Sequence, residues 1–115
     1  MKLRGIVQGF GWILCTVLIS SQFLTAQQGD AAAGKAVFTK SCAGCHAPAG
    51  EGKDTLAKAL KVEMRHLGSK EVQAKSDDQI RNAVVEGLGK MKPVKGLSGA
   101  DLNNLLAYTR SLAEK

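Results

Sequence analysis

Apolar residues in the second half of the chain recur at helical spacing, and no run alternates as a half-buried β-strand would. One such segment begins at Ser76, whose partner three residues later, Gln79, completes a capping-box pattern, and it ends at Gly87. The apolar face of this predicted helix consists of Ile80, Ala83, Val84 and, as its outermost member, Leu88.

A last helix is predicted to begin at Ser98, with Asp101 in the capping-box position. Its wide apolar face consists of Leu102, Leu105, Leu106, Tyr108, Thr109 and Leu112. A first helix begins at Asp30 and runs through Gly34 and Phe38 toward Ser41. Because glycine within a helix costs about 1 kcal/mol relative to alanine, Gly34 predicts close approach of another helix.

Two loops lie between these helices. Glycine and proline cluster in the first, residues 47–53, and the second, residues 90–97, contains Met91 and Pro93. The stretch from Asp54 to Val62 favours a short helix or an irregular segment. The sequence therefore predicts a single all-α domain.

Residues 1–26 have the layout of a secretory signal peptide: Lys2 and Arg4, an uncharged apolar run, and a small-residue end near Ala26. We expect cleavage there and export of the 27–115 domain to the periplasm. The alternative is an uncleaved membrane anchor, although the apolar run is shorter than the span of about 20 residues that a membrane helix needs. Under either interpretation the domain is exported, because Lys2 and Arg4 favour the cytoplasmic side of the membrane.

Removal of this segment leaves Phe38 and Tyr108 as the only aromatic residues, so the core is thin and a bulky apolar cofactor would complete it. The remaining 14 basic and 10 acidic residues give a mildly cationic domain that favours acidic partner proteins. The basic residues are scattered and form no nucleic-acid motif, so nucleic acid is not an expected partner.

The motif Cys42-Ala43-Gly44-Cys45-His46 is typical of c-type haem attachment. Two thiols three residues apart reach the two vinyl groups of one porphyrin edge, and the histidine that follows becomes an axial iron ligand. Three alternatives compete. A zinc site would require Cys42, Cys45, His46 and His66 together. A thioredoxin-like pair expects a β-α-β context, and a disulfide across two residues would be strained.

Three downstream residues are candidates for the sixth iron ligand. Met91 is favoured because it lies in a glycine-flanked loop between Lys90 and Lys92, where a core methionine is unusual. Met64 and His66 are the alternatives. A neutral thioether favours ferrous iron and completes the coordination sphere, which favours electron transfer over catalysis.

These residues resemble those of small bacterial class I c-type cytochromes, which carry one haem. The resemblance spans Gly34 and Phe38, the Cys42–His46 motif, the loop at 87–91 and the leucine-rich last helix with Tyr108. It implies three to five helices wrapped around one covalently bound haem c and its iron. It also implies crossing terminal helices, with Gly34 and Phe38 against Leu105 and Tyr108.

Two features depart from the family pattern. Lys92 separates Met91 from Pro93, whereas relatives place proline directly after the ligand methionine. In many relatives a backbone carbonyl, often of a proline, accepts a hydrogen bond from the axial histidine, and Pro48 is the only proline near His46.

The expected function is that of a monomeric electron carrier and not an enzyme, with Lys90, Lys92 and Lys95 around part of the haem edge for acidic redox partners. Two other classes remain open. One is a permanent haem c subunit of a larger respiratory or dehydrogenase complex. The other is a gas sensor or peroxidatic enzyme with an open iron.

Overall fold

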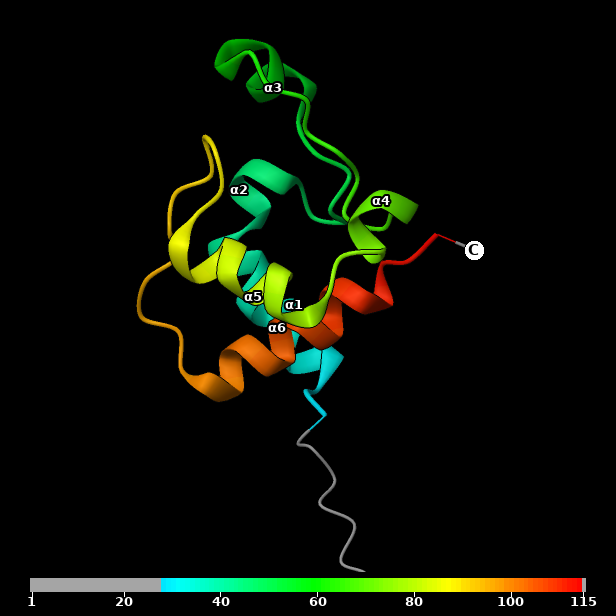
Figure 1. Ribbon diagram of the computed structural model, residues 1–115, viewed down its shortest axis with the longest axis vertical. Helices are drawn as coiled ribbons and strands as arrows, with labels where there is room; N and C mark the ends of the chain where they lie inside the picture. The colour runs from blue at the N-terminus through cyan, green and yellow to red at the C-terminus, as the bar shows by residue number, and fades with distance from the viewer. Residues whose placement is uncertain (1–27, 115) are drawn as a thin grey trace, which may run out of the picture.

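The computed structural model describes residues 28–114 and is helical throughout (Figure 1). Its helices are α1 (Ala31–Ser41), α2 (Ala43–His46), α3 (Asp54–Leu60), α4 (Lys70–Gln73), α5 (Asp77–Glu86) and α6 (Gly99–Ser111). Over these residues the chain forms no strand, and the one isolated β-bridge joins Leu88 to Met91. The prediction of an all-α fold is confirmed, although the single turns α2 and α4 were not predicted.

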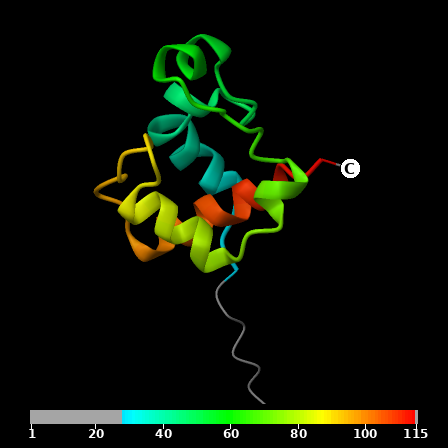
Figure 2. The ribbon, with the colours of Figure 1, turned by 45° about the horizontal axis from the view of Figure 1, so that its top comes forward.

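The first and last helices cross and form the centre of the molecule (Figures 1 and 2). At the crossing, a Cβ atom placed on Gly34 would overlap the carbonyl oxygen of Asn104 and lie 2.9 Å from the Cβ of Tyr108. Glycine is therefore required here by contact between the two backbones, which offsets its low helix propensity. The predicted crossing is confirmed, with Asn104 as a contact that the sequence did not indicate.

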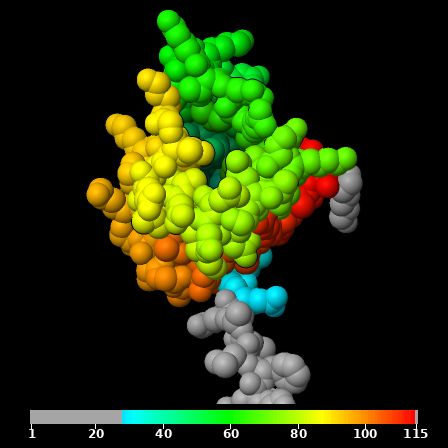
Figure 3. Space-filling view, viewed as in Figure 1, coloured from blue at the N-terminus to red at the C-terminus, as the bar shows by residue number. Residues whose placement is uncertain are grey.

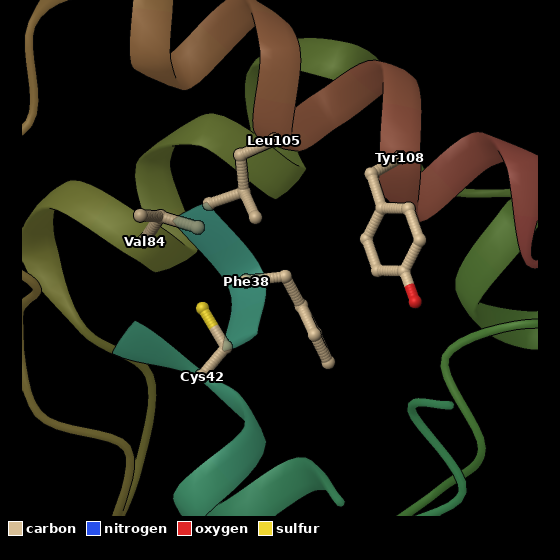
Figure 4. Packing of buried hydrophobic residues seen from close by; sticks show 5 residues of the cluster. All are labelled: Phe38, Cys42, Val84, Leu105 and Tyr108. Atoms are coloured by element: carbon tan, nitrogen blue, oxygen red, sulfur yellow. The ribbon is translucent and has the colours of Figure 1, made fainter. Parts of the chain in front are cut away.

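The core on one side of this crossing is small (Figure 4). Phe38 is the most buried large side chain, at 1% exposure, and its ring centroid lies 5.1 Å from that of Tyr108 at an interplanar angle of 56°. This tilted arrangement is a favourable one for aromatic pairs. Cys42, Val84 and Leu105 complete the buried cluster, which we call the core cluster.

Side-chain caps start the three long helices where the sequence predicts. Asp30 accepts hydrogen bonds from the backbone of the first turn of α1, and Ser76 with Gln79 forms the capping box of α5. Ser98 and Asp101 form that of α6. Hydrogen bonds from Ser98, first from its backbone N–H and then from its hydroxyl, lower the pKa of Asp101. The caps satisfy donors that a helix start leaves free.

Arg110 fastens the segment between α4 and α5 to the last helix. Its guanidinium donates to the carbonyl oxygens of Gln73 at 2.8 Å and Lys75 at 2.7 Å, and to the carboxylate of Asp77 at 2.8 Å. Gln73 in turn donates to the carbonyl oxygen of Thr109 at 2.9 Å. This network fixes α4 and the start of α5 against α6.

The α3 segment stands away from the helix crossing (Figures 1 and 2). The chain departs and returns at adjacent points, where the N–H of Leu67 donates to the carbonyl oxygen of Gly50 at 2.8 Å. Lys61 ends the helix in the left-handed conformation, with φ of 54°. Of the two alternatives predicted for residues 54–62, a short helix or an irregular segment, the structure shows the short helix.

Leu88 does not belong to the apolar face of α5, because it is 64% exposed. The helix ends at Glu86, and the positive φ of Gly87, 83°, turns the chain before Leu88. Helical periodicity fails to place Leu88 because it assumes that the helix continues.

The predicted signal peptide or anchor, residues 1–26, and its boundary with the 27–115 domain lie outside the described residues. Within residues 28–114, none of the helices combines the length and the apolar character that crossing a membrane requires.

Candidate functional site

The Cys42–His46 motif lies at the corner between the first two helices. Cys42 caps the end of α1, and the remaining residues form the single turn α2, in which the N–H of His46 donates to the carbonyl oxygen of Cys42 at 2.9 Å. Cys42 and Cys45 form no disulfide among the described residues. The corner thus presents two sulfurs and an imidazole within five consecutive residues.

The two cysteines differ in environment. Cys42 is 8% exposed, and its thiol points toward Val84 beside Phe38, whereas Cys45 is exposed (Figure 4). Burial raises the pKa of the Cys42 thiol, and the neighbouring Cys45 raises it further. Cys42 therefore anchors the motif to the core cluster, and Cys45 faces outward.

His46 carries a buried nitrogen without a partner. Its Nδ1 is inaccessible to solvent and makes no hydrogen bond with any described residue. Burial lowers the pKa of His46, which favours the neutral imidazole at neutral pH. Because metals bind neutral imidazole, the His46 ring is suited to ligate a metal that the polypeptide does not supply, and its buried Nδ1 lacks the partner that would orient the ring.

The turn that follows His46 adopts an uncommon conformation. Ala47 is 6% exposed and has φ of 64° and ψ of 163°, a combination that glycine adopts readily and alanine rarely. The next residue, Pro48, accepts a hydrogen bond at its carbonyl oxygen from the hydroxyl of Tyr108 at 3.2 Å. The carbonyl of the one proline near His46 in the sequence is therefore engaged by α6.

Met91 lies in a tight turn that begins where α5 ends. Leu88 and Met91 exchange two backbone hydrogen bonds of 3.0 and 2.9 Å, and the positive φ of Gly89, 58°, permits the turn. The Met91 side chain is half-buried and packs against the core cluster that contains Cys42.

The far end of this loop is fixed as well. The N–H of Val94 donates to the carbonyl oxygen of Val84 at 2.8 Å. A Cβ atom on Gly87 would lie 2.6 Å from the carbonyl oxygen of Met91 and 2.9 Å from the ring of Pro93. Pro93 therefore packs against Gly87, even though Lys92 separates it from Met91. This packing and the Val94–Val84 hydrogen bond together hold the Met91 loop in place.

The two alternative ligands lie elsewhere. Met64 belongs to the α3 segment, where it packs beside Gly52 and lines an open depression with side chains of α3. His66 accepts a hydrogen bond at Nδ1 from the N–H of Gly68 at 2.9 Å, and Glu114 lies 3.7 Å from the same nitrogen. Neither residue belongs to the core cluster or packs against it.

The zinc alternative is not supported by the arrangement of ligands. In the part of the chain that the structure describes, no three histidine, cysteine, aspartate or glutamate side chains gather as a metal site. His66 is engaged with Gly68 and Glu114, so it does not join Cys42, Cys45 and His46.

The surface around the motif is suited to a flat apolar group. The space-filling view shows a hollow between the α3 segment, the loop after α5 and α4, with the segment around the motif at its floor (Figure 3). Several apolar side chains at the core cluster are only partly buried: Leu67, Met91, Val94 and Leu97. Thiols, a partnerless imidazole and incompletely covered apolar side chains together fit a covalently held porphyrin.

Comparison with known proteins identifies the family. Residues 29–108 match the family described as "Cytochrome C oxidase, cbb3-type, subunit III". The chain belongs to the c-type cytochromes. This cytochrome is 37% identical over 90 residues to cytochrome c-554(547) of Halothiobacillus neapolitanus, a match that covers 73% of this chain and 98% of the relative.

Two further similar proteins are also cytochromes. Cytochrome c6 of Picosynechococcus sp. is 37% identical over 90 residues, covering 74% of this chain and 75% of its own. The solved structure of the c-type cytochrome KustC0563 superimposes with a TM-score of 0.61 at 27% identity, covering 70% of this chain and 98% of that one. The family carries covalently bound haem c with its iron, and this cytochrome is an electron-transfer protein.

Two elements of the site were not predicted. The Tyr108–Pro48 hydrogen bond joins residues 60 positions apart, and no local pattern indicates it. The close contacts of Gly87 with Met91 and Pro93 were also missed. A glycine placed before a methionine loop is a signal for a tight turn but does not reveal what packs on it.

Proposed function

We propose that Cys42 and Cys45 attach haem c through their sulfurs, that His46 and Met91 are the axial iron ligands, and that the protein shuttles single electrons. The observation that carries this proposal is the shared packing of the motif and the Met91 loop on the core cluster. The bound haem supplies a one-electron couple, and thioether ligation favours its ferrous form. Because both axial positions are taken by side chains, no enzymatic role is expected.

Mass analysis tests the attachment. The exported polypeptide should exceed its sequence mass by one haem, and the peptide that contains residues 42–46 should carry the addition. A Cys42→Ala, Cys45→Ala variant should lose it. An unmodified polypeptide, or a zinc ion in place of haem, would contradict the proposal. N-terminal sequencing of the same sample checks cleavage near Ala26 and export to the periplasm.

The docking surface for redox partners is proposed to lie beside the Met91 loop. Lys90, Lys92 and Lys95 are exposed, and the ion pairs within residues 28–114 involve none of them. Exposed apolar side chains accompany them: Leu88 at 64% and Val85 at 50%. Cations around an apolar centre favour a partner with an acidic rim and an apolar contact area.

Salt should slow electron transfer to such a partner. As ionic strength rises from about 10 mM to about 300 mM, the second-order rate constant should fall by about tenfold or more, because the Debye length shortens from about 30 to less than 10 Å. Stopped-flow measurements with an acidic redox protein check this. Glutamine at Lys90, Lys92 and Lys95 should flatten the dependence, whereas the charge-matched triple variant at Lys35, Lys70 and Lys75 should not. If the rate constants of the two triple variants depended equally on salt, the partner would dock at another surface.

A second candidate function is a permanent subunit of a larger complex, which the family description favours because it names an oxidase subunit. Gel filtration of the gently released periplasmic fraction separates the two. A shuttle elutes as a free monomer with its haem absorbance, whereas a subunit elutes with a larger assembly or stays with the membranes.

A further inference from the structure

Tyr108 connects the last helix to the turn that follows the haem motif. Its ring packs against Phe38 in the core cluster, and its hydroxyl points away from α6 (Figure 4). The hydroxyl donates to the carbonyl oxygen of Pro48 at 3.2 Å, two residues after His46. Tyr108 as a whole is only 8% exposed, and the bond itself is partly buried. A buried phenol hydroxyl needs a hydrogen-bond partner. Because this partner lies in the turn after His46, the bond also affects how that turn holds His46.

The turn needs external support, because Ala47 occupies a backbone conformation that alanine rarely adopts. Three of its hydrogen bonds are internal to the segment: Gly52 to the His46 carbonyl at 2.7 Å, Gly50 to the Ala47 carbonyl at 3.1 Å, and Ala49 to the Glu51 carboxylate at 2.8 Å. The bond from Tyr108 is the one that joins the turn to α6. It therefore limits how far the peptide groups beside His46 can rotate.

The imidazole of His46 lacks the partner that would fix its orientation. Its Nδ1 is buried and has no hydrogen bond within residues 28–114. The partner of a metal-bound imidazole sets both its orientation and its basicity.

We propose that Tyr108 is a positioning residue for His46: its hydroxyl holds the Pro48 carbonyl and the Ala47 turn in place, and so fixes the backbone that follows the imidazole. This inference rests on the proposed role of His46 as an iron ligand. Without the hydroxyl, the turn loosens and admits water to the His46 ring. Greater solvent exposure favours the more highly charged ferric form and lowers the reduction potential.

Tyr108→Phe tests this, because phenylalanine keeps the ring against Phe38 and removes only the hydroxyl. Thr109→Val is the matched control: it removes the neighbouring buried hydroxyl of α6, which bonds to the Leu105 carbonyl at 2.9 Å and not to the turn. Each haem-loaded variant is equilibrated with a redox dye of known potential. The exchange of the His46 ring N–H with deuterium is followed by NMR.

We expect Tyr108→Phe to shift the dye equilibrium about three- to tenfold toward the ferric protein, as the loss of one hydrogen bond implies. Ring N–H exchange should accelerate, and Thr109→Val should change neither quantity by more than about twofold. An unchanged or raised potential in Tyr108→Phe, or an equal shift in Thr109→Val, overturns the inference.

The haem mass and the red absorption band of the unmodified protein report separately on the proposed function. If they are absent, both proposals fail. If they are present and Tyr108→Phe behaves as the unmodified protein, only the positioning role fails.

Discussion

Replacing Met91 with alanine should abolish the weak long-wavelength absorption band of the ferric protein that marks sulfur–iron ligation. A soft, neutral thioether stabilises ferrous iron relative to ferric. Its loss should therefore shift the redox equilibrium toward the ferric form by at least about tenfold, which corresponds to about 59 mV for one electron. The ferrous variant should also bind carbon monoxide at neutral pH, because an axial position has been opened.

Met64→Ala is the control for this result, since Met64 lies in the α3 segment and does not pack against the core cluster. It should keep the band and the potential. A band that persists in Met91→Ala and disappears in Met64→Ala or His66→Ala would identify a different ligand. Carbon monoxide binding to the unmodified ferrous protein would instead support an open iron, as in a sensor or a peroxidatic enzyme.

Gly34→Ala should strongly destabilise the fold. The added methyl group would overlap the Asn104 carbonyl oxygen and lie 2.9 Å from the Cβ of Tyr108. Backbone atoms cannot move aside as flexible side chains do, so α1 and α6 must separate. We expect the free energy of unfolding to fall by about 3 kcal/mol or more, at the upper end of what overpacking costs. Denaturant unfolding followed by circular dichroism measures this.

Gly99→Ala separates this steric effect from helix propensity. Gly99 is the first residue of α6, and a Cβ atom there would meet no atom within 4 Å. Because alanine is the better helix former, this variant should be unchanged or slightly stabilised, by less than about 1 kcal/mol. A stable Gly34→Ala protein would show that the two helices do not depend on close backbone contact.

The parts of the fold that the sequence predicted were those with local causes. Asp30, Ser76 and Ser98 start helices through hydrogen bonds to residues two or three positions away, so their effect is visible in a short window. The Cys42–His46 motif is equally local, and it indicated the c-type cytochrome family, which the comparisons confirm. Mid-helix Gly34 predicted a close crossing because its low propensity needed an offsetting contact.

The features that were missed depend on distant residues. The guanidinium of Arg110 bonds to the 73–77 segment, and Tyr108 bonds to Pro48, through side chains whose partners the sequence does not specify. The single turn α4 forms within that tertiary network and is too short to carry a periodic pattern. The role of Met91 was inferred from residue type and loop context, and its ligation stays a prediction.

The backbone bond between Gly50 and Leu67 makes the excursion of residues 51–66 a closed loop attached at its base. Since the cost of closing a loop grows only slowly with its length, residues can be inserted or deleted in this excursion with little effect on the helix crossing. Insertions after Gly52, whose N–H bonds to the His46 carbonyl, can be accommodated there without displacing the motif or the Met91 loop. The excursion is therefore the natural place for this scaffold to acquire new surface.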